Sequence, residues 1–308
     1  MTTAHPEWTL TRTDEFETVT LNRQGETIER ARHTAQMFVE DLGKGVHLEL
    51  AAIPGGAFTM GSPDGSGYED EAPRHQVLVT PFLMAQHLIT QQQWRVLMGD
   101  NPYCRFKGDR LPVEYVSWVQ AQEFCRRLAK VTGRAYRLPA EAQWEYACRA
   151  GSQAPFYCGE TITTDQANYV GEHIYASEPK GIYRHTTTPG GSFPPNAFGL
   201  YDMAGNLWEW CADVWHPNYR GAPVTGSAWE TGGDPSCRVT RGGSWHEIPG
   251  HCRSAVRVRF EAAFGDEQVG FRVALDDSQI TSTQPIKSMR GFLKGIDTSM
   301  PREDDRIF

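Results

Sequence analysis

Residues 151–240 constrain the fold most, because they are rich in Gly, Pro, Thr and aromatic residues and have little helical or strand periodicity. A stretch this long without regular structure needs a ligand, an ion or its own aromatic cluster to hold it in place. The whole chain shares this character: of 308 residues, 30 are Gly, 19 are Pro and 11% are aromatic. Large rings must therefore pack among many turns, which predicts a loop-rich α+β protein.

The charge and cysteine content exclude several classes of protein. A net charge of −8 argues against a nucleic-acid groove, which needs clustered Lys and Arg, and favours a protein, glycan or other small-molecule partner. No stretch reaches about 18 consecutive apolar residues and the start lacks a signal-peptide pattern, so we expect a cytoplasmic protein without membrane contact. Seven scattered cysteines without a CxxC pair predict neither a zinc site nor a disulfide framework.

Three helices are predicted from apolar spacing and capping signals. Residues 26–42 place apolar side chains at helical intervals before Gly43 (Ile28, Ala31, Ala35 and Phe38). Thr90 can cap a second helix, and Ser117 with Gln120 forms a capping-box signal for a third. Residues 46–54 instead alternate polar and apolar positions, as a strand does.

These patterns divide the chain into an N-terminal extension at 1–45, one domain at 46–276 and a tail at 277–308. The extension is predicted to hold the first helix. The tail is predicted to be flexible. Alternatively, its short apolar face could dock on a partner or on the domain (Met289, Phe292, Leu293 and Ile296). The acidic loop at 69–71 is expected to be solvated, and could rim a binding surface.

Six phrases in fixed order carry a family resemblance. They are GGAFTMGS, PVEYVSWVQAQEFCRRL, RLPAEAQWEYACRAG, NAFGLYDMAGNLWEW, RGGSW and GFRVA. Together they resemble the formylglycine-generating enzyme (sulfatase-modifying factor) family from about residue 48 to 274. The resemblance implies an elaborated C-type-lectin-like α+β fold that is poor in regular structure.

The active enzymes of that family oxidise a sulfatase cysteine to formylglycine with dioxygen, using two cysteines that hold Cu(I), a metal that soft thiolates select. The position of the first cysteine here is Glu247. Counting forward places Cys252 at the second, whereas aligning the following RSAVR moves it out of register. In either case the thiol pair is missing, which argues against formylglycine generation.

A second branch of the fold matches the end of the domain better. The retroelement-diversified variable proteins of bacteria frame a variable stretch with RGGSW, CRSA-x-R and GFR, and this chain keeps that frame between Arg241 and Arg272. We name residues 245–268 the recognition segment and predict that they form a ligand-binding surface beside Trp245. The other predicted ligand-binding residues are His246, Glu247, Ile248, His251, Val256, Val258, Phe260, Glu261 and Phe264.

The GNLWEW phrase resembles the family's calcium site. Carried over, Asn206 and Glu209 would supply side-chain oxygens, and Gly205 and Leu207 would supply carbonyl oxygens, of the kind Ca²⁺ prefers. A second calcium site of the family uses an Asp just before the FPPN phrase. This chain has Gly and Ser there, so we expect that ion to be absent.

The chain is therefore predicted to be a non-catalytic binding module for a ligand or protein, with a structural Ca²⁺. The alternative is an oxygen- and metal-dependent oxidoreductase with copper or iron near His246, His251 and Cys252, although their spacing is not that of a helical histidine pair. A third possibility is a scaffolding subunit that uses its N-terminal helix and its tail as contacts. We assign no catalytic residue.

Overall fold

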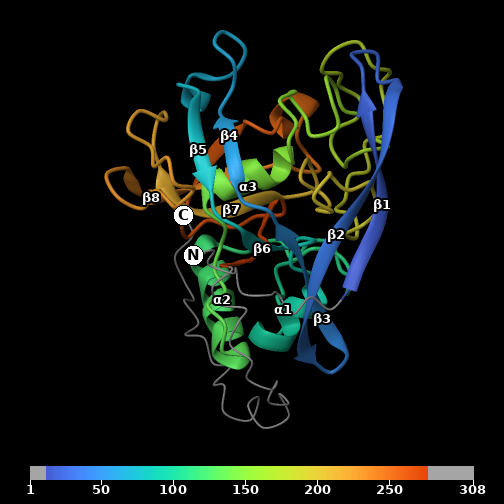
Figure 1. The fold of residues 1–308 in the computed structure, drawn as a ribbon. Coiled ribbons are helices and arrows are strands. Elements are labelled where there is room, and N and C mark those ends of the chain that lie inside the picture. Colours follow the sequence, from blue (N-terminus) through green and yellow to red (C-terminus); the bar gives the residue numbers. More distant parts are fainter. Residues whose placement is uncertain (1–11, 277–308) are drawn as a thin grey trace, which may run out of the picture.

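The computed structural model describes residues 12–276 of the 308. The N-terminal half forms most of a five-stranded antiparallel sheet, and the last strand of the domain closes it at one edge (Figure 1). In spatial order its strands are β1 (Arg12–Leu21), β2 (Thr27–Gly43), β3 (Val46–Ile53), β6 (Phe82–Ala85) and β11 (Ala274–Asp276).

The prediction of a helix at 26–42 is wrong, because nearly all of these residues belong to the long strand β2. In its first half the less exposed side chains alternate, as at His33, Ala35 and Met37, and then the phase changes so that Met37 and Phe38 are both buried. This change of phase, together with the exposed apolar residue Ile28, imitates helical spacing. Pairing with β1 on one side and β3 on the other decides the conformation.

The two helices with local capping signals are confirmed. Helix α1 (Gln91–Met98) begins after Thr90, and α2 (Trp118–Thr132) begins after Ser117; both have a complete capping box. Helix α2 is capped after its last residue by Gly133, whose φ of 75° is left-handed, and it buries the predicted face (Ala121, Phe124, Cys125 and Leu128). A third helix, α3 (Glu141–Arg149), follows.

The C-terminal half adds a four-stranded sheet in the order β10 (Val269–Gly270), β7 (Trp208–Trp215), β8 (Asp234–Arg241) and β9 (Arg257–Glu261). A separate ribbon pairs β4 (Gly56–Met60) with β5 (His75–Val79). Helix α3 lies against this ribbon and against β7 and β8, whereas α1 packs against α2 and against β2 and β3 (Figure 1). Two short 3-10 turns complete the elements: η1 (Glu69–Glu71) and η2 (Pro249–Cys252).

Residues 151–207 contain no helix and no strand, as their composition predicts, but the rest of the stretch expected to be irregular, 208–240, contains β7 and most of β8. Side-chain bonds to the backbone hold this stretch. The Asn196 amide donates to the carbonyls of Ala147 and Cys148, and its oxygen accepts from the N–H groups of Phe198 and Leu200. The irregular backbone is thus satisfied by buried polar side chains. Within residues 12–276 no helix is long and apolar enough to cross a bilayer.

Candidate functional site

Four buried arginines lie within the recognition segment or close to its two ends in the sequence. Arg253 bonds Glu71 at 2.7 Å and Arg257 bonds Glu141 at 2.7 Å. Each of these two pairs joins residues more than 100 positions apart in the chain, so Arg253 and Arg257 tie the segment to the rest of the domain. The other two pairs are Arg241 with Glu145 and Arg272 with Glu209. We call these four pairs the arginine frame.

Burial and ion pairing shift the pKa of Glu145, a carboxylate of the arginine frame, in opposite directions. Burial raises the pKa of Glu145, but Arg149 and Arg241 outweigh it, and the net pKa lies below the ordinary value. The carboxylate therefore stays ionised in the core. Glu71, expected to be solvated, is instead fully buried against Arg253. Arg259 of the same segment is exposed, and its guanidinium lies 5.9 Å from the centre of the Trp215 ring.

The predicted ligand-binding residues form two groups. The first surrounds η2, where His251 Nδ1 lies 2.6 Å from a Glu247 oxygen and the Trp208 indole donates to the other oxygen at 3.4 Å. His246 bonds the Tyr183 hydroxyl through Nδ1, and Ile248 is 42% exposed.

The second group lies at the end of β9. Phe260 and Phe264 stack with ring centres 5.0 Å apart, and Glu261 between them is exposed. Phe260 also meets Trp210 edge-on at 6.1 Å, and Val258 is partly buried. In the second group, therefore, Phe260 and Val258 are partly buried, whereas Glu261 and Phe264 are exposed.

Two predicted ligand-binding residues are wrong because they belong to the core. Trp245 is only 2% exposed, since its indole donates to the Glu267 carbonyl at 2.9 Å and its ring packs edge-on against Phe106 at 5.3 Å. Val256 is 1% exposed and lies in the main apolar cluster, one residue before Arg257 of the arginine frame. Neither can touch a ligand at the surface.

Aromatic residues from other loops join the first group, and sequence reasoning missed them. Tyr68 is 50% exposed and its ring lies 6.2 Å from His251; Tyr175 is 37% exposed and lies beside Gly250. The available signal was an aromatic residue within each Gly- or Ser-containing loop. We call this surface the η2 face, and its members are Tyr68, Tyr175, His246, Glu247, Ile248 and His251.

The thiol and imidazoles of the alternative metal site do not converge. Cys252 is buried, burial raises the pKa of its thiol, and its sulfur lies 3.9 Å from the Ile248 carbonyl. His246 and His251 pair with different partners, Tyr183 and Glu247. Among residues 12–276 no group of three or more His, Cys, Asp or Glu side chains is arranged to hold a metal ion.

Glu209 does not fit the calcium ligand set, because both of its oxygens accept from Arg272 at 2.6 Å and one also accepts from the Trp144 indole. Asn206 lies in a cluster that retains unpaired oxygens. It bonds Thr188 and Asn168, and each of these has a buried side-chain oxygen without a partner in the described part of the chain. A hard cation would find oxygen donors there.

Comparisons with known proteins agree with this architecture. Residues 44–277 match the family described as the sulfatase-modifying factor enzyme 1-like domain. The serine/threonine-protein kinase pkn1 of Chlamydia pneumoniae is 32% identical over 73% of this chain, but the match spans only 38% of the kinase. The formylglycine-generating enzyme of Thermomonospora curvata is 26% identical over 77% of this chain and 95% of the enzyme.

Two solved structures share the fold. PvdO from Pseudomonas aeruginosa is 33% identical, with a TM-score of 0.68 over 78% of this chain and 98% of that one. Variable protein 1 of Treponema denticola is 25% identical, with a TM-score of 0.67 over 78% of this chain and 99% of that one. The resemblance and the fold class expected from the six phrases are thus confirmed.

Proposed function

The chain belongs to the sulfatase-modifying factor enzyme 1-like family, and from that premise we propose that it is a non-catalytic binding module. Its ligand would be a protein or a glycan, bound on the η2 face. The observation that carries this proposal is the contrast between a buried frame of ion pairs and the exposed aromatic and ionisable side chains mounted on it. A fixed backbone that carries both apolar and polar exposed side chains suits ligand binding rather than catalysis.

The missing thiol pair supports binding over oxidation. Glu247 stands where the family's first active-site cysteine would lie, and its carboxylate already bonds His251 and Trp208. The remaining thiol, on Cys252, is buried. These side chains lack the pair of soft thiolates that Cu(I) requires.

The η2 face offers both anchors and selectivity. Tyr68, Tyr175 and Ile248 supply large exposed apolar surface, and interfaces usually depend on a few such anchors. His246, His251 and Glu247 supply polar groups at the same surface. Tyrosine and histidine rings also stack on sugar faces, so the chemistry suits a protein or a glycan.

A paired set of variants tests the proposal. We expect Tyr68→Ser with Ile248→Ser to weaken binding of a ligand selected on a glycan array or by cross-linking by more than about tenfold. The melting temperature should change by only a few degrees, since about half of each side chain is exposed and neither belongs to a core cluster. Phe260→Ala with Phe264→Ala and Glu261→Ala is the matched set for the other group. Loss of binding in that set alone would contradict the proposed face.

Metal analysis of protein purified without chelator tests the cofactor part of the proposal. We propose about one Ca²⁺ per chain near Asn206, with oxygens of Asn168 and Thr188 and the Gly205 and Leu207 carbonyls as donors. Chelation should then lower the melting temperature. Stoichiometric copper or iron, lost when His246 or His251 is replaced, would instead support the oxidoreductase.

A further inference from the structure

A cavity of about 440 Å³ lies between the β4–β5 ribbon and the end of α3, and it is built from residues outside the η2 face. Its apolar wall consists of three neighbouring aromatic rings, with Tyr146 in contact with both of the others. Tyr146 lies 5.3 Å from Phe58 and 5.7 Å from Phe198, measured between ring centres. The volume falls within the roughly 300–1,000 Å³ usual for small-molecule pockets. A wall of this kind favours a flat apolar ligand.

The cavity has a positive character in a chain of negative net charge. Its lining includes Arg74 and Arg149 but no acidic residue, although the whole chain has a formal charge of −8. Arg149 is already occupied, because it bonds Glu145 and the carbonyls of Ala154 and Gly61. Arg74 is exposed and has no ion-pair or hydrogen-bond partner within residues 12–276. Its guanidinium is therefore available to an anion.

Neutral hydrogen-bonding groups complete the lining. The Tyr146 hydroxyl is protonated at neutral pH, as tyrosine ordinarily is, and burial raises its pKa further. Gln153 is exposed at the rim, and Gln76 donates to Thr59 at 2.6 Å, which leaves its side-chain carbonyl to accept. One cation, a hydroxyl and two carboxamides around an aromatic wall match an amphiphilic anion.

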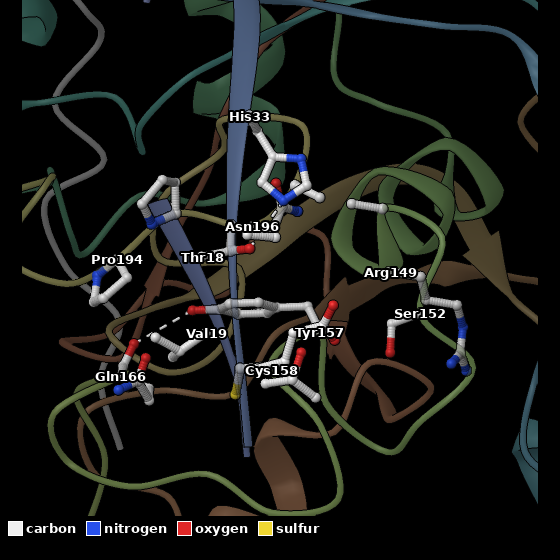
Figure 2. A pocket seen from close by; sticks show the side chains of 16 residues that line it. Thr18, Val19, His33, Arg149, Ser152, Tyr157, Cys158, Gln166, Pro194 and Asn196 are labelled. Atoms are coloured by element: carbon white, nitrogen blue, oxygen red, sulfur yellow. Dashed lines mark hydrogen bonds between the residues drawn. The ribbon is translucent and has the colours of Figure 1, made fainter. Parts of the chain in front are cut away.

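A neighbouring cavity of about 220 Å³ beneath the β1–β2 hairpin provides the contrast (Figure 2). It shares Arg149 and Ser152 with the first cavity, and Figure 2 shows both on one side of its lining. Its polar groups already serve one another: Thr18 bonds His33 at 3.0 Å, and the Tyr157 hydroxyl donates to the Gln166 carbonyl. With its only arginine occupied, this cavity offers no charge to an anion.

We propose that the cavity at the end of α3 binds a small aromatic carboxylate. The ring of the ligand lies against Phe58, Tyr146 and Phe198, and its carboxylate pairs with the guanidinium of Arg74. The planar guanidinium suits a carboxylate, because it can donate two parallel hydrogen bonds.

Titration calorimetry with 1-naphthoate at neutral pH tests this site. Arg74→Met should weaken binding by about tenfold or more, because a charge-assisted pair is lost. Arg110→Met is the matched control, since Arg110 is also exposed but does not line the cavity. The uncharged 1-naphthamide should bind wild-type protein about as weakly as naphthoate binds the Arg74→Met variant.

Two further variants locate the ligand. Gln153→Glu, an isosteric change at the rim, places a negative charge in the cavity and should weaken naphthoate but not naphthamide. Tyr68→Ser on the η2 face should leave the affinity for naphthoate unchanged, which separates this site from the proposed recognition surface. Absence of naphthoate binding, equal binding of acid and amide, or an unchanged affinity in Arg74→Met would overturn the proposal.

Discussion

The Glu247 carboxylate connects a surface imidazole to the core, because it accepts from both His251 and the Trp208 indole. The hydrogen bond that the His251 ring donates to the Glu247 carboxylate raises the pKa of His251 above its ordinary value of 6.5. The imidazolium is therefore favoured on the η2 face at pH values where an isolated histidine would be neutral.

Replacing Glu247 with Gln should lower the pKa of His251. The stability that this pair contributes is present in full below about pH 6.5 and is lost as the pH rises through the raised pKa of the folded state. Titration of the His251 ring protons by NMR measures the shift, and His47, which is not part of the η2 face, is the internal control. An unchanged His251 titration would show that Glu247 is not the cause.

The ion pair between Arg253 and Glu71 is buried, so we expect Arg253→Met to destabilise the protein. Removing the guanidinium leaves a buried carboxylate without its partner, and the free energy of unfolding should fall by about 3–5 kcal/mol. Urea denaturation measures the loss. Arg259→Met, at an exposed arginine of the same segment, should change it by less than about 0.5 kcal/mol.

Among the elements, helices α1 and α2 could be predicted from sequence because their signals are local. A cap residue, a partner three positions later and a terminal glycine all lie within each helix or next to it. Strand β2 could not, since its conformation depends on β1 and β3. The same limit applies to the site: His246, Glu247 and Ile248 follow from one segment, whereas Tyr68 and Tyr175 reach it through the fold.

Local capping also yields a stability prediction for α2. Ser117 accepts a hydrogen bond from the Gln120 N–H at 3.2 Å, and Ser117→Ala should lower the free energy of unfolding by about 1 kcal/mol. Thermal or urea denaturation measures the change. Thr13→Ala, at an exposed position in β1, is the control and should be close to neutral. Equal effects of the two substitutions would argue against the cap.

At the scale of the whole molecule, the folded domain begins earlier in the chain than the family match does. The match begins at residue 44 and so leaves out β2, which ends at Gly43. Strand β2 nevertheless pairs with β3 along most of the length of β3. Met37, Phe38 and Leu42 of β2 are buried in the two main apolar clusters. The β1–β2 hairpin is therefore packed into the domain through β2, and it is not the helical extension expected from sequence.

A chain that starts at residue 44 should not fold stably. Each buried apolar side chain of β2 contributes about 1.5–3 kcal/mol, and several are lost together with a full strand of hydrogen bonds. Circular dichroism and heteronuclear NMR spectra of the truncated chain measure the outcome. A cooperative melting transition equal to that of the full chain would contradict this view of the hairpin.

The arginine frame has a consequence for how this protein could change. Its four ion pairs are buried, whereas His246 and Ile248 of the η2 face are exposed and His251 is partly exposed. A combinatorial library at His246, Ile248 and His251 should therefore keep most of its members folded. New specificities could be selected without first repairing stability, so the frame makes this domain a natural starting point for engineered binders.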